Sequence, residues 1–300
     1  MNRRDFIFQT SFFVAGSALS FPGLLQKIHS QAFTPIRRNV GIFQGRGGTI
    51  GWLADSNAII AIDSQFPGSA REFITGIKSY SDQSIDTLIN THHHGDHTAG
   101  NVAFQGIVKQ IVAHENVPGL QRASAESQGN AADQVYPDVT YRDEWKLDTG
   151  DEIIHLNYYG RAHTGGDTVI TFEKANVVHM GDLIFNRWYP FIDRNGGALV
   201  QNWITLLETV VERTNSDTRF IFGHGSSEFG VTGSQSDILV MRDFLQRLIE
   251  EVQSGIDSGK SKEEIIQVES FREFPDHVSP GARLSLETNL STVYDEITGN

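Results

Sequence analysis

Four potential metal ligands lie within one run of six residues. The segment THHHGDHT, residues 91–98, contains the pattern His-x-His-x-Asp-His. Imidazoles two positions apart can point the same way and chelate one ion, and the Asp-His pair just beyond can begin a second site. The run follows a strand-like segment, 85–90, and α/β proteins place their chemistry in loops that follow strands. A polar turn that is merely rich in histidine is the alternative, and this position argues against it. The ligands are His92, His94, Asp96 and His97.

The longer segment THHHGDHTAGN, residues 91–101, resembles the signature loop of the metallo-β-lactamase superfamily. Its form is especially similar to that of the hydroxyacylglutathione hydrolases (glyoxalase II). Four further pieces that resemble the family's pattern follow in the family's order, and the resemblance covers roughly residues 40–230. They are Asp63 closing AIIAID, His163 in GRAHTGGD, Asp182 in HMGD and His224 in FGHG.

The resemblance implies a site for two metal ions. His92, His94 and His163 would hold the first ion. Asp96, His97 and His224 would hold the second, and Asp182 would bridge the two. Asp63 would support the metal loop from behind and orient a ligand histidine through its free ring nitrogen.

Imidazole and carboxylate ligands without thiolate suit Zn²⁺, although iron and manganese accept such sites. Two zinc ions roughly 3.5–4 Å apart can share a water and bring its pKa toward about 7. The resulting hydroxide would attack a carbonyl-type electrophile, and Asp96 would help to steer it.

Composition narrows the classes of protein. The chain has 300 residues, 39% of them hydrophobic, so it can bury one large core or two modest ones. A net charge of −13 argues against a nucleic-acid-binding surface, and a small molecule is the expected substrate. The absence of cysteine excludes disulfides, thiolate metal sites and a cysteine nucleophile.

The N-terminus resembles a targeting segment. Arg3 and Arg4 are followed by a weakly apolar stretch, 6–21, which is short for a membrane span. The pair resembles the twin-arginine export motif, which implies the twin-arginine export machinery as a partner and a periplasmic location. We expect a signal segment over 1–33 and no stable membrane insertion after processing. An uncleaved anchor or a buried amphipathic helix is the alternative.

Apolar runs and helical periodicity predict a mixed α/β chain. Together with the resemblance, they predict an αββα sandwich of two mixed β-sheets flanked by helices. We expect a catalytic domain over 34–235 and a helical C-terminal extension over 236–300, packed on the same domain. A polar stretch, 121–138, is expected to lie on the surface beside the site. The predicted strands are 40–43, 49–54, 58–63, 85–90, 111–113, 153–158, 168–172, 177–180 and 219–222, and the predicted helices are 69–80, 202–213, 234–254, 262–268 and 286–297.

An aromatic segment, 182–193, directly follows the expected bridging ligand. Core packing should use at least two of its four rings, and the others could form an apolar pocket wall. Many true β-lactamases of the superfamily have Cys at the bridging position and Lys three residues later, and this chain has Asp182 and Phe185 there. That departure weakens a β-lactamase assignment, although Arg187 could hold a substrate carboxylate. The expected substrate contacts are therefore Arg187, Trp188 and Tyr189.

The remaining histidines have structural explanations. His93 is expected to point away from the metals, and His114, His155 and His179 lie on or beside predicted strands. His29 and His277 are expected at the surface.

The sequence therefore predicts an exported, dinuclear zinc hydrolase acting on an ester, thioester, lactone or lactam. Three alternatives stay open: a β-lactamase proper, an iron-dependent redox protein similar to persulfide dioxygenases, and a non-catalytic metal-binding accessory protein. A glutathione thioesterase is disfavoured, because no basic glutathione site is evident in the extension.

Overall fold

Two β-sheets face each other at the centre of the computed structural model, which describes residues 32–299. The twin-arginine segment and His29 lie outside these residues. The first sheet has seven strands in the order of the chain, with an antiparallel meander from β1 to β4 and parallel pairing from β4 to β7. Its strands are β1 (Phe33–Arg37), β2 (Val40–Phe43), β3 (Ile50–Ala54), β4 (Ile59–Ile62), β5 (Ile85–Ile89), β6 (Gln110–His114) and β7 (Val139–Tyr141).

The second sheet has six strands in the order β15-β13-β11-β10-β9-β8. Pairing is antiparallel except between β11 and β13, which run parallel. Its strands are β8 (Glu144–Asp148), β9 (Ile153–Asn157), β10 (Val169–Phe172), β11 (Val177–His179), β13 (Arg219–Ile221) and β15 (Thr232–Gly233). A short parallel pair, β12 (Phe185–Asn186) and β14 (His224–Gly225), lies apart from both sheets.

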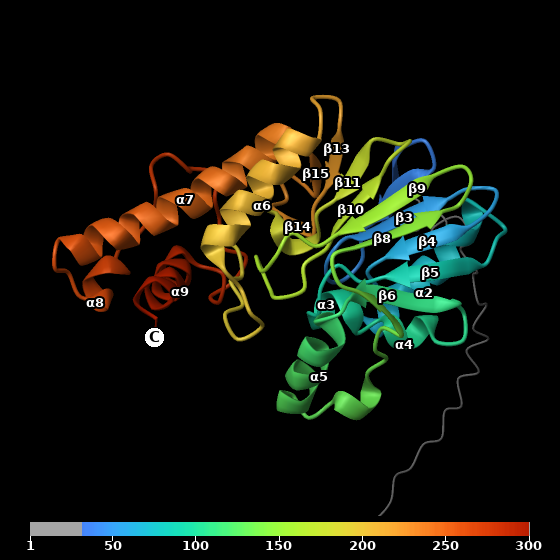
Figure 1. The fold of residues 1–300 in the computed structure, drawn as a ribbon, viewed down its shortest axis with the longest axis horizontal. Helices are drawn as coiled ribbons and strands as arrows, with labels where there is room; N and C mark the ends of the chain where they lie inside the picture. Colours follow the sequence, from blue (N-terminus) through green and yellow to red (C-terminus); the bar gives the residue numbers. More distant parts are fainter. Residues whose placement is uncertain (1–31, 300) are drawn as a thin grey trace, which may run out of the picture.

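Helices cover the outer faces of the sheets (Figure 1). On the first sheet, Phe73 and Phe104 of α2 and α4 pack against Phe43 and Trp52. On the second, α6 and α7 share a buried cluster with Phe220 of β13. The helices are α2 (Pro67–Gly76), α3 (Gly95–Thr98), α4 (Asn101–Phe104), α5 (Val117–Ser127), α6 (Val200–Arg213), α7 (Gln235–Asp257), α8 (Lys262–Ile265) and α9 (Leu286–Thr298), with 3₁₀ turns η1 (Ile77–Ser79), η2 (Ala131–Asp133) and η3 (Gly181–Leu183).

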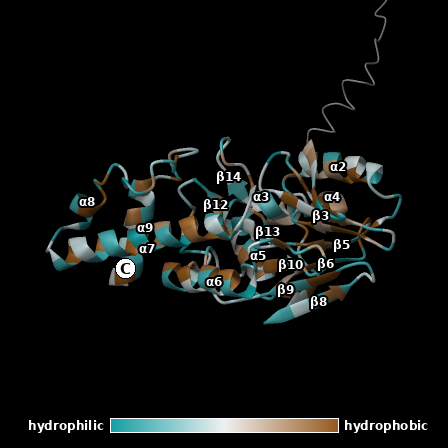
Figure 2. Cartoon of the chain, turned by 90° about the horizontal axis from the view of Figure 1, so that it is seen from above, coloured by the Kyte–Doolittle hydropathy of each residue, from teal (hydrophilic) through white to brown (hydrophobic). Residues whose placement is uncertain are grey.

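The apolar core between the sheets follows from strands that are apolar on their facing sides. Ile60, Ile62 and Ile89 of the first sheet meet Ile170 and Phe172 of the second within one buried cluster. Figure 2 shows the strands β5, β6 and β10 largely in brown, whereas the C-terminal helices alternate between brown and teal along their length. The architecture is the predicted αββα sandwich, and the expectation of two mixed sheets flanked by helices is confirmed.

The C-terminal part of the chain packs against α6. Residues Phe244 and Leu248 of α7 and Leu290 of α9 belong to the same buried cluster as Trp203 of α6. Figure 1 places α6, α7, α8 and α9 together on one side of the strands. In residues 32–299, no helix is both long enough and apolar enough to cross a membrane.

Helix α5 is the main element that the sequence did not predict. Its second half overlaps the start of the segment 121–138, which was expected to be a polar surface segment. Gln121 and Ala125 are buried, but the helix has few large apolar residues and Pro118 occupies its first turn. Such a helix shows little apolar periodicity, although a proline in the first turn is a recognised start signal.

Candidate metal centre

The predicted ligands come from loops that meet at one edge of the sandwich. His92, His94, Asp96 and His97 follow β5 directly, and Asp182 and His224 follow β11 and β13. The two sheet edges are joined there: Thr168 N–H donates to Thr91 O over 2.9 Å, and Thr49 N–H donates to Gly223 O over 2.9 Å. These backbone bonds fix the spacing between the loops of the two sheets.

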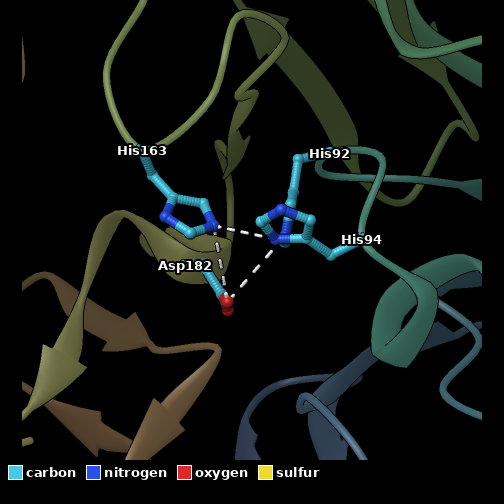
Figure 3. A group of neighbouring side chains, drawn as sticks. All are labelled: His92, His94, His163 and Asp182. Atoms are coloured by element: carbon cyan, nitrogen blue, oxygen red, sulfur yellow. Dashed lines mark hydrogen bonds and ion pairs between the residues drawn. The ribbon is translucent and has the colours of Figure 1, made fainter. Parts of the chain in front are cut away.

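A first cluster brings three imidazoles and one carboxylate together (Figure 3). His94 Nδ1 lies 3.0 Å from His92 Nε2 and 3.1 Å from His163 Nε2. Asp182 Oδ2 lies 3.8 Å from His92 Nε2 and 3.7 Å from His163 Nε2. Three ring nitrogens and one carboxylate oxygen therefore face a common centre.

A second cluster shares the carboxylate of Asp182. His97 Nε2 lies 3.0 Å from Asp182 Oδ1, and His224 Nε2 lies 3.4 Å from Asp182 Oδ2. Asp96 Oδ2 lies 3.1 Å from His224 Nε2 and 3.7 Å from His97 Nε2. The seven residues expected as ligands thus form two groups with Asp182 in contact with both, and their role as ligands stays a prediction.

Asp63 fixes the orientation of the metal loop from behind. Its carboxylate is fully buried and accepts hydrogen bonds from Thr91 N–H at 2.7 Å, Thr91 Oγ1–H at 2.8 Å and His97 Nδ1–H at 2.7 Å. Because Thr91 Oγ1 donates to Asp63, it can accept from His92 Nδ1–H, 3.0 Å away. One carboxylate therefore sets which ring nitrogen keeps the proton when His92 and His97 are neutral, and in that form the lone pair lies on Nε2.

The other two ligands of the first cluster are fixed in the same way. His163 Nδ1–H donates to Phe191 O over 2.7 Å, so His163 Nε2 carries a lone pair. His94 Nε2 lies 2.9 Å from Asp193 Oδ2, so its Nδ1 faces the cluster unprotonated. The sequence reasoning did not identify Asp193, and the only local sign is the turn in which Asp193 Oδ1 accepts from Gly196 N–H.

Burial lowers the pKa values of the first-cluster imidazoles. Burial and the neighbouring His94 bring the pKa of His163 to about 3. Burial, together with His97, holds the pKa of His92 well below its ordinary value. These imidazoles are neutral at pH 7, which is the form that binds a metal.

Charge pairing dominates in the second cluster. Burial opposes protonation of His224, but Asp182 and Asp96 outweigh it and raise its pKa to about 9. Burial likewise opposes protonation of His97, and the carboxylates around it raise its pKa well above the ordinary value. Burial would raise the pKa of Asp96, yet His97 and His224 lower it to about 2. A cation that binds here must displace protons from the imidazoles.

The donor set fits a pair of zinc ions. Ligands 2.0–2.1 Å from a tetrahedral zinc ion lie about 3.3 Å from one another, close to the 3.0–3.1 Å between the first-cluster nitrogens. The lone pairs of His92, His94 and His163 converge with no proton between them in these tautomers, an arrangement that a cation stabilises. Oδ1 of Asp182 is buried and faces His97 Nε2, 3.0 Å away.

Two glycines leave room for the second cluster. A side chain at Gly48 would overlap the imidazole ring of His97, and one at Gly223 would overlap Oδ1 of Asp182. Both positions therefore need glycine for close backbone approach rather than for an unusual backbone conformation.

A cavity of about 380 Å³ opens over the two clusters. Phe185, Trp188 and Phe191 form an apolar wall. Ser124 of α5 and Gln128, the residue after α5, are polar lining residues. His224 is stacked between Phe185 and Trp188, with both interplanar angles 18°. The other residues lining the cavity are His94, Gly95, Asp96, Asp182, His224, Arg283 and Leu284.

The structure places two of the three expected substrate contacts outside the lining of this cavity. The guanidinium of Arg187 lies 3.1 Å from Asp237 Oδ1 and donates to Asn186 Oδ1, and Arg187 does not line the cavity. Tyr189 packs against Phe244 and also lies outside the lining. Trp188 does line the cavity. The backbone turns at Arg187, where φ is 60°, so neighbouring side chains of this segment point apart.

Other histidines occupy structural positions. His93 Nε2 faces Asp193 Oδ2 at 3.3 Å and belongs to neither of the two clusters above. His155 pairs with Glu173 over 2.6 Å. The prediction that His277 lies on the surface is wrong: it is 7% exposed and stacks on Phe244 with ring centroids 4.5 Å apart.

Structural contacts also account for the last two histidines. His114 stacks on Tyr158 with ring centroids 3.7 Å apart. His179 Nδ1 accepts from Gly181 N–H over 3.1 Å, which helps to hold the turn before Asp182.

Comparison with known proteins gives matches over most of this architecture. The family described as "Metallo-beta-lactamase superfamily" matches residues 66–228, more than half of the chain. A metallo-β-lactamase from Pontibacter korlensis superposes with a TM-score of 0.58 at 20% identity, covering 71% of this chain and 98% of that chain. The stereoselective inverting sec-alkylsulfatase Pisa1 from Pseudomonas sp. superposes with a TM-score of 0.71 at 14% identity, covering 89% of this chain and 50% of that chain. At these identities the likeness concerns the fold alone.

A curated protein is also similar to this chain in sequence. The 2,4-dinitroanisole O-demethylase subunit alpha of Nocardioides sp. (strain JS1661) is 31% identical over 136 residues, which are 44% of this chain. The match spans 40% of the length of that relative.

Proposed function

Since the chain belongs to the metallo-beta-lactamase superfamily, we propose that it is a hydrolase that works with two zinc ions. His92, His94 and His163 would hold the first ion, Asp96, His97 and His224 would hold the second, and Asp182 would contact both. The observation that carries the proposal is the sharing of Asp182 by two clusters whose imidazole nitrogens face inward. An accessory protein on this fold would have no need of a full set of seven ligands.

When bound, such a pair of ions supplies Lewis acidity and a water of lowered pKa. The residues of the chain supply orientation. Asp63 and Asp193 hold His97 and His94 in the tautomers that bind metal. Asp96, whose side chain is 32% exposed beside the cavity, is placed to accept a hydrogen bond from the attacking water and to steer it. No further protein base is required.

The proposed substrate is an ester-type compound with an apolar portion, because Phe185, Trp188 and Phe191 form one side of the cavity. Ester, thioester and lactone substrates all meet this description. Turnover of β-lactams has less support, since Arg187 is engaged by Asp237 and lies away from the cavity.

A second candidate is cleavage of a sulfate ester or of an aryl ether. The alkylsulfatase superposes on 89% of this chain, beyond the 71% covered by the lactamase from Pontibacter korlensis. The O-demethylase subunit is the relative that shares 31% sequence identity. Both reactions are hydrolyses in which water cleaves a bond to an oxygen atom, and both could take place at the same proposed centre.

A substrate panel tests the proposal. The zinc-loaded protein is assayed with an aryl ester, a thioester, a lactone, a β-lactam, an alkyl sulfate and an aryl methyl ether. His92→Ala should abolish turnover of whichever compound is cleaved, whereas His155→Ala, which removes a partly exposed imidazole paired with Glu173, should leave it unchanged. Turnover that survives His92→Ala would contradict a role for the metal centre, and no turnover of any compound would contradict the hydrolase.

The identity of the bound metal distinguishes an iron-dependent redox protein from the proposed hydrolase. A protein similar to persulfide dioxygenases would carry a single iron. A protein with two zinc ions and no bound iron supports the hydrolase instead.

We also propose that residues 1–33 direct export through the twin-arginine route to the periplasm, on the basis of Arg3 and Arg4. Replacing both with lysine should leave the protein in the cytoplasm. Periplasmic accumulation of this double variant would contradict the proposal.

A further inference from the structure

A tight turn near the C-terminus reaches the cavity. Leu284 N–H donates to Gly281 O over 2.9 Å, and the same two residues form an isolated β-bridge. Arg283 and Leu284, at this turn, both line the cavity of about 380 Å³ over the metal clusters. The C-terminal part of the chain therefore contributes directly to the proposed active site.

Both sides of this turn are anchored to the pocket wall. Before it, Val278 N–H donates to Arg187 O, and Tyr189 N–H donates to Val278 O. After it, the buried Asn289 of α9 donates from Nδ2 to Pro190 O over 2.7 Å. The turn is thus held at a defined place beside the aromatic wall.

Two arginines of this region are paired with carboxylates. Arg187 pairs with Asp237, and Arg247 pairs with Glu251. No hydrogen bond or ion pair involves the guanidinium of Arg283 anywhere in residues 32–299. Within that range, Arg283 is also the only lysine or arginine that lines this cavity.

The rest of the lining consists of apolar residues, the neutral polar residues Ser124 and Gln128, and members of the two clusters. The apolar part of the lining is formed by the rings of Phe185, Trp188 and Phe191. The acidic part is formed by the carboxylates of Asp96 and Asp182. The carboxylates are committed to the imidazoles of the two clusters. A free guanidinium at the rim of an apolar cavity fits a molecule with an apolar body and an anionic end.

We propose that Arg283 determines specificity by binding a carboxylate or sulfonate-like group of the substrate, whose apolar body lies on Trp188 and Phe191. The substrate class is then an amphiphilic anion with a hydrolysable bond placed over the metal clusters. This inference rests on the proposed function for its catalytic meaning, but the binding site can be tested separately.

Binding of inert ligands tests the site directly. Octanoate, octanesulfonate and octanamide share an apolar chain and differ at the head, and none contains an ester. Isothermal titration calorimetry on the zinc-loaded full chain should give about tenfold tighter binding of at least one anion than of the amide. The relative loss for carboxylate and sulfonate in the variants below identifies the preferred head group.

Three variants give the comparison. Arg283→Ala should weaken anion binding about tenfold and leave the amide unchanged, and Arg283→Lys should fall between, because it keeps the charge without the planar fork. Arg272→Ala removes an exposed arginine of the same C-terminal segment that does not line the cavity, and it should change neither. Thermal unfolding of each variant checks that the fold is intact.

Several results would overturn the inference. The first is an anion affinity that is equal in wild type and Arg283→Ala. The second is a loss of affinity in Arg283→Ala that is equal for anion and amide, and the third is the same loss of anion affinity in Arg272→Ala. The fourth is that no ligand binds. Anion binding that depends on Arg283 in a protein that cleaves no substrate would uphold this inference and contradict the proposed function. If the protein hydrolyses neutral and anionic esters and neither activity changes in Arg283→Ala, the proposed function is upheld and this inference is contradicted.

Discussion

Replacing Asp63 by asparagine should weaken the second metal site. Asparagine tolerates the left-handed backbone of this position, where φ is 65°, so the loop geometry is kept. Its oxygen can still accept from Thr91 N–H, but its amide group would donate toward His97 Nδ1 and Thr91 Oγ1. The neutral form of His97, which is the form that binds a metal, would then carry its proton on Nε2, which faces Asp182, and no longer on Nδ1. A metal must displace that proton and reverse the tautomer.

The expected loss follows from the contacts. Asp63 accepts three hydrogen bonds of 2.7–2.8 Å, and the asparagine variant keeps one of them. Loss of a partner that orients a ligand typically weakens metal binding by about 10- to 100-fold. Two lost hydrogen bonds to a buried carboxylate should also lower the free energy of unfolding by about 3 kcal/mol.

Zinc titration against a competing chelator measures the two site affinities. Glu152→Gln is the matched control, because Glu152 is a buried carboxylate that accepts three backbone N–H groups in another part of the structure. It should reduce stability without changing zinc affinity. If Asp63→Asn binds the second zinc as tightly as wild type, the argument that Asp63 sets the tautomer of His97 is refuted.

Three further outcomes are expected. Gly48→Ala should displace the ring of His97 and reduce zinc content toward one per chain, measured by elemental analysis. His277→Phe should flatten the pH dependence of stability in urea unfolding: burial and then Arg187 depress the pKa of His277 to about 4, so its stabilisation is present above pH 6.5 and lost as pH falls toward 4. At pH 5 the wild type should lose about 2 kcal/mol more than the variant. Arg187→Ala should lower the free energy of unfolding by about 2 kcal/mol by leaving Asp237 unpaired, with no change in KM for anionic substrates.

The candidate metal site was accessible from the sequence in two ways. Asp96 and the histidines after β5 were named from their spacing behind a strand-like run, and His163, Asp182 and His224 were named from the resemblance to the superfamily. Buried, apolar runs such as β4 were predictable because periodicity and burial are local signals, whereas the order of strands within each sheet was not predicted.

The substrate side of the cavity was not accessible in this way. Arg283 lies about a hundred residues beyond Asp182, and only the packing of α7 and α9 on α6 brings it to the cavity. Asp193 forms an ordinary turn in sequence, and its contact with His94 depends on the folding of two distant loops. Contacts of this kind depend on tertiary packing, for which a single sequence carries no spacing rule.

The number and identity of bound metals test the central claim most directly. Elemental analysis of the purified full chain, expressed with zinc and iron both available, should give two zinc ions per chain and little iron. One metal per chain, or mainly iron, would contradict the dinuclear zinc hydrolase.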